Sequence, residues 1–203
     1  MIGMLLNKDL LIATHNAGKL EEICSLLDDF PINIISAKDC GLLEPIETED
    51  TFIGNARIKA HAAAKKTGIP SLADDSGLEV YALGGAPGVY TADWAETRTG
   101  RDFNMAMGKV NDALKKINAP FPRRARFCCT LVLAWPDGSD EVFFGSVDGE
   151  IVWPMRGQLG HGYDPIFQPN GYSTTFGELD PSEKNKISHR SLAFNKLVES
   201  IRA

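Results

Sequence analysis

The sequence has no apolar run long enough to cross a bilayer, and its first residues lack the charged start and long apolar stretch of a secretion signal. It contains only four cysteines, none in a Cys-x-x-Cys pair, which argues against a zinc site and suits a reducing compartment. The net charge of −6 argues against a surface for nucleic acid. These absences predict a cytoplasmic protein with neither a membrane nor a nucleic-acid partner.

The composition is that of an ordinary globular protein. Of the 203 residues, 43% are hydrophobic and 24% are charged, and the sequence contains no repeat, low-complexity segment or long linker. Strand-like and helix-like apolar patterns alternate, which predicts an α/β fold: an elongated mixed β-sheet flanked by helices, with a cleft between two lobes. Expected strands cover residues 10–13, 32–36, 124–135 and 140–152, and expected helices cover 19–27, 51–67, 102–117 and 182–201.

The turn THNAGK, from Thr14 to Lys19, lies between the first expected strand and the first expected helix. Backbone N–H groups and the positive end of a helix dipole meet at such a turn, which makes it an anion site. Thr14 and Asn16 add side-chain donors. Lys19 adds a charge, and Gly18 permits close approach. The turn is not a Walker A loop, since nothing matches GxxxxGK[ST]. The alternative is a capped helix start with a solvent-exposed lysine.

Two adjacent carboxylates, Asp74 and Asp75, follow an apolar stretch in the segment ADDSGL. Burying them without a cation is costly. Neighbouring strand residues point to opposite faces, so both could bind one metal only at a turn or strand end, and Ser76-Gly77 is expected to supply that turn. The functional interpretation is a Mg²⁺ site in which one carboxylate takes a proton from water. The alternative is an exposed Asp-Asp-Ser-Gly turn.

An acidic loop precedes the second expected helix and contains four carboxylates: Glu44, Glu47, Glu49 and Asp50. Acidic residues suit a helix N-terminus, which is the simpler interpretation, but one of them could also reach a metal held by the aspartates. Thr51 can cap the helix, and Gly68 can end it. Lys59, two turns into the helix, either adds positive charge to the cleft or lies on a solvated helix face.

The segment GHGYDPIF, residues 160–167, places glycines around ring side chains. This pattern indicates a loop that presents an aromatic face to a flat ligand. His161 or Tyr163 could stack on a nucleobase. The alternative is a tight loop with Tyr163 packed in the core.

The segment EKNKISHR, residues 183–190, is rich in hydrogen-bond donors. Lys184 could meet a phosphate or a base carbonyl. His189 and Arg190 are adjacent donors near a helix start, and the guanidinium fork suits carbonyl acceptors on a base. The alternative is a solvated basic turn.

Five segments, taken in order, resemble the non-canonical purine nucleoside triphosphate pyrophosphatases, the inosine triphosphatase or Ham1-like enzymes. The segments are THNAGK, EDTFIGNARIKA, LADDSGLEVYALGGAPGVYTA, GHGYDPIFQP and ELDPSEKNKISHR. The resemblance runs from about residue 11 to about residue 196. It implies a single two-lobed pyrophosphatase domain over residues 1–203, a central substrate cleft and a homodimer. It also implies Mg²⁺-dependent hydrolysis of ITP, dITP and XTP to the monophosphate and pyrophosphate.

The resemblance assigns roles to residues that match the family's motifs. Glu47 and Asp75 are implied to bind Mg²⁺, with Asp74 in support, and Asp75 is also the implied acceptor of the proton from water. Residues implied to bind the substrate are Thr14, His15, Asn16, Ala17, Gly18, Lys19, Lys59, Ser76, His161, Gly162, Tyr163, Asp164, Lys184, His189 and Arg190.

Two residues depart from the family's pattern: His161 stands where many members carry Phe, and His15 stands where Gly is frequent.

Two other functions compete with the implied one. The chain could be a pyrophosphatase for other modified nucleotides, or a sensor that binds a nucleotide without hydrolysing it. Asp74, Asp75 and Lys19 argue against a sensor.

Overall fold

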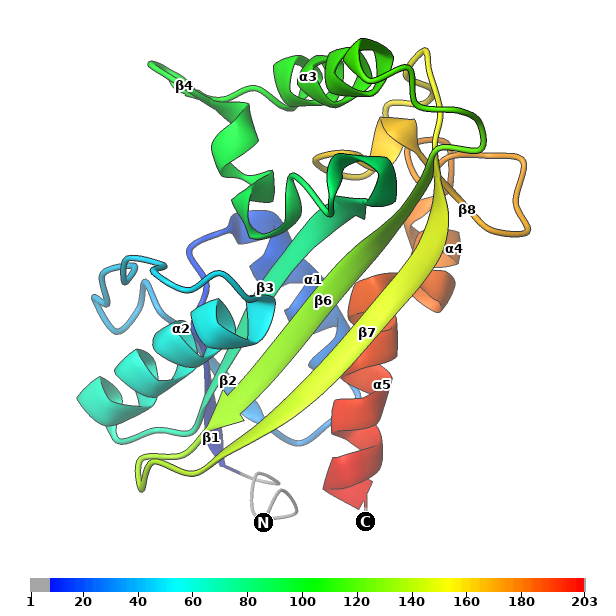
Figure 1. The fold of residues 1–203 in the computed structure, drawn as a ribbon. Coiled ribbons are helices and arrows are strands. Elements are labelled where there is room, and N and C mark those ends of the chain that lie inside the picture. The colour runs from blue at the N-terminus through cyan, green and yellow to red at the C-terminus, as the bar shows by residue number, and fades with distance from the viewer. Residues whose placement is uncertain (1–7, 203) are drawn as a thin grey trace. The chain divides into compact units, whose positions relative to one another are not determined.

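A computed structural model describes residues 8–202. The first seven residues, in which the sequence predicts no secretion signal, lie outside the described part. Figure 1 shows a central β-sheet flanked by helices, so the predicted mixed α/β fold is confirmed. Among the described residues, no helix is both long and apolar enough to span a bilayer.

Six strands form the central sheet in the order β2-β1-β3-β6-β7-β8, and β4 and β5 form a separate pair. The strands are β1 Asp9–Ile12, β2 Asn33–Ser36, β3 Ser71–Val80, β4 Glu96–Thr97, β5 Gly100–Arg101, β6 Arg124–Ala134, β7 Asp140–Ile151 and β8 Phe167–Pro169. The helices are α1 Ala17–Leu27, α2 Phe52–Thr67, α3 Phe103–Lys116, α4 Pro181–Ile187 and α5 His189–Arg202, with short 3₁₀ turns η2 Tyr81–Leu83, η3 Gly88–Thr91, η4 Asp93–Ala95 and η5 Asp164–Ile166.

The chain divides into two compact units, and the division falls within β3, β6, β7 and the first turn of α5. The first unit comprises the chain up to Asp75, residues 129–145 and the chain from Ser191 onward. The second unit comprises residues 76–128 and 146–190. The cleft between two lobes and the single-domain organisation stay predictions.

In the first unit, alternate strand residues pack against different helices. Ile12 belongs to a buried cluster with Ile23 of α1 and Phe194 of α5. Its neighbour Leu11 belongs to another cluster with Ala56 of α2. The alternation follows from the two-residue repeat of a strand. One sheet face therefore carries α1 and α5, and the other carries α2, as Figure 1 shows.

Helix α2 begins and ends where the sequence predicts. The Thr51 side chain accepts a hydrogen bond from the Gly54 backbone N–H at 3.1 Å, and Gly68 ends the helix with a positive φ of 71°. A glycine adopts that backbone conformation without the steric cost that a β-carbon adds. The buried face of the helix is mostly alanine, which brings its backbone close to the sheet.

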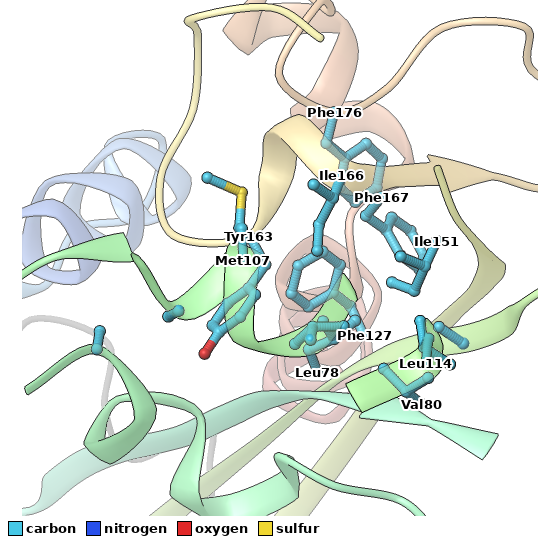
Figure 2. Packing of buried hydrophobic residues seen from close by; sticks show 14 of the residues in the cluster. Leu78, Val80, Met107, Leu114, Phe127, Ile151, Tyr163, Ile166, Phe167 and Phe176 are labelled. Atoms are coloured by element: carbon cyan, nitrogen blue, oxygen red, sulfur yellow. The ribbon is translucent and has the colours of Figure 1, made fainter. Parts of the chain in front are cut away.

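In the second unit, the core combines aromatic rings with aliphatic side chains (Figure 2). The rings of Phe127 on β6 and Phe167 on β8 lie 4.6 Å apart edge to face, and Phe176 stacks on Phe127 at 6.0 Å. Tyr163 lies in the same cluster, as does Met107 of α3. This core supports the loop before η5 and the start of α4.

Three boundaries differ from the prediction. Strand β3 continues without a break through Ser76 and Gly77, so the expected turn after the aspartates is wrong. Strand β8, which was not among the expected strands, begins at Phe167, the last residue of the expected loop. The expected C-terminal helix is two helices, because Ser188 adopts an extended conformation (φ −72°, ψ 154°) between α4 and α5. Serine is a favoured residue at a helix start.

Candidate active site

The turn between β1 and α1 is a capped helix start. The Asn16 side chain accepts a hydrogen bond from the Lys19 backbone N–H at 3.2 Å, and the Thr14 hydroxyl accepts one from the Asn16 backbone N–H at 3.2 Å. These bonds cap the start of α1, and the positive end of its dipole lies at this turn. The turn residues His15, Asn16 and Ala17 are exposed, so a ligand can reach them.

Lys19 is not the solvated lysine of the simpler interpretation. Its Nζ lies 2.9 Å from a carboxylate oxygen of Asp74, whose side chain is fully buried. Asp74 points to the sheet face that carries α1, because it is two residues from Leu72, which packs on that face. The capped turn and the first aspartate are therefore joined by one ion pair.

Asp75 points to the opposite face, toward α2. Its carboxylate lies 3.8 Å from Nζ of Lys59, and the same Nζ lies 2.6 Å from Glu47. We call Glu47, Lys59 and Asp75 the Lys59 cluster. Since β3 runs straight through both aspartates, their side chains alternate in direction, and the strand geometry favours Asp75 over Asp74 as a partner for Glu47.

The Lys59 cluster shifts the proton affinities of its members. Burial raises the pKa of Asp75 to about 6; Lys59 opposes that rise and Glu47 adds to it. Burial alone would lower the pKa of Lys59, but Asp74, Asp75 and Glu47 together raise it. The lysine is thus charged at neutral pH and compensates carboxylates that would otherwise be costly to bury.

The predicted metal ligands are not assembled as a ready-made site. Within residues 8–202, no group of three or more His, Cys, Asp or Glu side chains is placed to hold a metal ion. The donor chemistry nevertheless fits Mg²⁺, because Glu47 and Asp75 offer carboxylate oxygens to the same cation, the Lys59 ammonium. The metal roles of Glu47, Asp74 and Asp75 stay predictions.

In the second unit, a buried ion pair organises the loop of residues 160–164. Nζ of Lys184 on α4 lies 2.5 Å from a carboxylate oxygen of Asp164, and both side chains are at least nine-tenths buried. The same oxygen accepts the backbone N–H of His161 at 2.6 Å. A β-carbon on Gly160 would meet this oxygen at 2.1 Å, so only glycine fits there. The loop is therefore folded around the Asp164 carboxylate.

The structure separates the two aromatic residues of this loop. Tyr163 is 1% exposed, packs edge to face on Phe103 and donates its hydroxyl to the Thr91 carbonyl at 2.9 Å. Of the two interpretations of Tyr163, the structure supports the ring packed in the core and not the ring that stacks on a base. His161 is exposed, so within this loop it is the ring that a flat ligand can reach.

The segment at the junction of α4 and α5 is buried rather than solvated. His189 stacks its ring on Phe127, with centroids 4.9 Å apart and planes 12° from parallel. Arg190 is 9% exposed. The simpler interpretation, a solvated basic turn, is therefore wrong for these two residues.

The sequence prediction missed residues that hold the acidic loop in place. Asn55 of α2 is 2% exposed, and its side-chain oxygen accepts the Glu49 backbone N–H at 3.0 Å. At the other end of the loop, Nε2 of His15 lies 2.8 Å from the Leu42 carbonyl oxygen. A signal for Asn55 was present: it lies one helical turn before Lys59, on the same face of α2.

Known proteins resemble this chain over nearly its whole length. The sequence model of the Ham1 family matches residues 10–200. A curated dITP/XTP pyrophosphatase of Ruegeria pomeroyi is 63% identical over 190 residues, covering 94% of this chain and 93% of that protein. One of Rhizobium meliloti is 53% identical, covering 97% of each chain.

Solved structures show the same fold. A HAM1 protein from Coxiella burnetii superposes with a TM-score of 0.88 at 38% identity, covering 96% of this chain and 98% of that one. The Ham1 protein of Staphylococcus aureus gives a TM-score of 0.84 at 35% identity, with the same coverage. Matches over nearly the whole length, in both sequence and structure, show that this chain belongs to the Ham1 family.

Proposed function

We propose that this chain hydrolyses the non-canonical purine nucleotides ITP, dITP and XTP to the nucleoside monophosphate and pyrophosphate. The observation that carries the proposal is the 63% identity with a curated dITP/XTP pyrophosphatase over nearly the full length of both chains. The role would be to clear deaminated purines from the nucleotide pool, and the cytoplasm is the location that suits it. A homodimer remains the proposed assembly.

We assign the triphosphate and the metal to the residues of the first unit. The turn from Thr14 to Lys19 would present the N-terminal end of α1 to phosphate oxygens. The Lys19 ammonium, which is paired with Asp74, would add its positive charge there. Glu47 and Asp75 would hold Mg²⁺, with Asp74 in support. When bound, Mg²⁺ would neutralise charge on the phosphates and the leaving pyrophosphate.

Asp75 is the proposed proton acceptor. Water attacks the α-phosphorus, the bond from that phosphorus to the bridging oxygen breaks, and the proton of the water passes to the Asp75 carboxylate. In the metal-free protein the pKa of this carboxylate is about 6, so it is mostly ionised above pH 7, and a bound cation would favour the ionised form further. Lys19 would offset the negative charge that develops on the leaving group.

We assign base recognition to the second unit. His161 would stack on the base, and Lys184, His189 and Arg190 would supply hydrogen-bond donors. Hypoxanthine and xanthine carry an acceptor oxygen at position 6, whereas adenine carries an amino donor there. Donors facing an amino group are left unpaired, at a cost of about 1–3 kcal/mol each. Rejection of ATP follows from this arrangement.

Replacing Arg190 tests the assignment of base recognition. We expect Arg190→Ala to raise KM for ITP and to narrow the preference for ITP over ATP by about tenfold or more, since one donor to the 6-oxo group is lost. The measurement is kcat/KM for both nucleotides. An unchanged preference in a folded variant would remove Arg190 from base recognition.

The proposed reaction is tested by offering ITP, XTP, GTP and ATP separately, with Mg²⁺ or with EDTA, and assaying pyrophosphate and orthophosphate independently. We expect Mg²⁺-dependent pyrophosphate from ITP and XTP and little product from ATP. Orthophosphate as the first product would contradict attack at the α-phosphorus. Turnover of modified pyrimidine nucleotides alone would favour a different pyrophosphatase, and tight ITP binding without turnover would favour a sensor.

A further inference from the structure

We propose that Asn55 is a positioning residue, which holds the loop that carries Glu47 against α2 and thereby sets the metal affinity of the site. The inference rests on the metal role proposed above for Glu47. Asn55 itself touches neither substrate nor metal in this proposal. It acts on the loop backbone, through the hydrogen bond from the Glu49 N–H to its side-chain oxygen at 3.0 Å.

The spacing of the contacts shows how the loop lies. Asn55 and Lys59 are one helical turn apart, on the same face of α2. Asn55 holds the backbone at Glu49, and Lys59 holds the side chain of Glu47 at 2.6 Å. Four residues of helix rise about 6 Å, and two residues of extended chain span about 6.6 Å. The loop therefore runs antiparallel to α2, and the spacing from Glu49 to Glu47 matches the spacing from Asn55 to Lys59.

Gly54 makes room for this path. A β-carbon at Gly54 would lie 2.5 Å from Cβ and 2.6 Å from Cγ of Glu49, closer than carbon atoms approach without bonding. The Glu49 side chain thus crosses the first turn of α2 at the one position that has no side chain. Helix geometry does not require this glycine, since its φ is not in the left-handed region. The glycine is required because the loop crosses the helix at this position.

Burial does not hold the middle of the loop. Leu43 is 87% exposed and Ile46 is 82% exposed, so neither packs into a core. The loop is held at specific points instead: at Leu42 by His15, and at Glu49 by Asn55. The Asn55 bond holds the loop backbone two residues from Glu47. The Lys59 contact, by contrast, must break when the Glu47 carboxylate binds a metal ion. Asn55 can hold the backbone in both states.

The test measures binding of Mn²⁺, as a probe for Mg²⁺, to the nucleotide-free protein by the electron paramagnetic resonance signal of free Mn²⁺. We expect Asn55→Ala to weaken Mn²⁺ binding by about tenfold or more, the range typical of residues that orient metal ligands. Asn55→Asp keeps an acceptor oxygen for the Glu49 N–H and should recover most of the loss. With ITP, the Mg²⁺ concentration for half-maximal rate should rise, while kcat at saturating Mg²⁺ stays within a fewfold of wild type.

Asn111 supplies a matched control. It is also 2% exposed and helical, and its side-chain oxygen also accepts one hydrogen bond, from Arg123 at 3.4 Å. Asn111→Ala should lower thermal stability comparably and leave Mn²⁺ affinity unchanged. If the two alanine variants weakened Mn²⁺ binding equally, the effect of Asn55 would be general destabilisation, and the inference would fail.

A second pair of variants tests the path of the loop without touching Asn55. Gly54→Ala should weaken Mn²⁺ binding, because the new methyl group displaces Glu49. Adding Glu49→Gly removes the colliding carbons and should restore part of the affinity. No recovery in the double variant would contradict the crossing geometry.

Glu47→Gln separates failure of this inference from failure of the proposed metal role. Wild-type Mn²⁺ affinity in Glu47→Gln would overturn the metal role of Glu47, and the inference with it. Weak binding in Glu47→Gln together with wild-type binding in Asn55→Ala would overturn the positioning role alone. Weak binding in both, with rescue by Asn55→Asp, is the expected result.

Discussion

Asp75→Asn is expected to abolish turnover and, in the absence of metal, to stabilise the protein at neutral pH. A folded variant should lose about 10³-fold or more in kcat for ITP, since the amide neither accepts the proton nor binds Mg²⁺ as a carboxylate does. Assays of kcat with saturating Mg²⁺ check this part. Near-wild-type turnover would remove Asp75 from the chemistry.

The gain in stability follows from the raised pKa. Asp75 is 5% exposed and has a pKa of about 6, above its ordinary value of 3.8. The folded state therefore holds the proton more tightly than the unfolded state does. The metal-free wild type loses free energy of unfolding as pH rises from about 4 to above 6, by up to about 3 kcal/mol. The Asp75→Asn variant does not lose this free energy of unfolding, because the asparagine side chain stays neutral at every pH.

Urea unfolding in EDTA at pH 4 and pH 7.5 measures the difference. Asp75→Asn should exceed wild type at pH 7.5 and approach it at pH 4. Asp74→Asn is the matched control, because Asp74 pairs with Lys19 at 2.9 Å and its charge is compensated. That control should not gain stability at pH 7.5. If Asp75→Asn were less stable than wild type at pH 7.5, ionised Asp75 would be stabilising, and the interpretation of its pKa would be wrong.

Several parts of the site were predictable because they depend on local chemistry. The capped start of α2 follows from Thr51, and its hydrogen bond confirms it. For α1, a capped start was the alternative to an anion site, and the structure shows Asn16 as the cap. The strand repeat by itself predicts that Asp74 and Asp75 point to opposite faces, and the structure shows this in place of the expected turn: one pairs with Lys19 and the other with Lys59. Such local rules need no knowledge of distant segments.

The wrong or missing predictions concern residues whose conformation or burial depends on segments far away in the sequence. Ser76 and Gly77 are poor strand formers and favour a turn, yet β3 continues through both residues as a central strand of the sheet. Tyr163 occupies a core whose rings come from β6, β8 and α3, which no local pattern reveals. Asn55 was not predicted as a site residue because its hydrogen-bond partner is a backbone N–H outside the helix.

Asp164→Ala is expected to cause the largest loss of stability. It would leave the Lys184 ammonium buried without its carboxylate partner, and the His161 backbone N–H without its acceptor. Breaking a buried ion pair from one side costs about 3–5 kcal/mol in free energy of unfolding. Urea unfolding at pH 7 measures the loss. Lys186→Met on the same helix is the matched control, since its 2.6 Å pair with Glu183 is exposed and should contribute little.

The double variant Asp164→Ala, Lys184→Met separates burial of a charge from loss of packing. Removing both charges should recover much of the lost stability, because no uncompensated ammonium remains. Affinity for ITP should not return, since Lys184 is a proposed donor to the base. A double variant no more stable than Asp164→Ala would mean that the carboxylate acts mainly through the loop of residues 160–164. The ion pair would then matter for the shape of that loop rather than for compensating a buried charge.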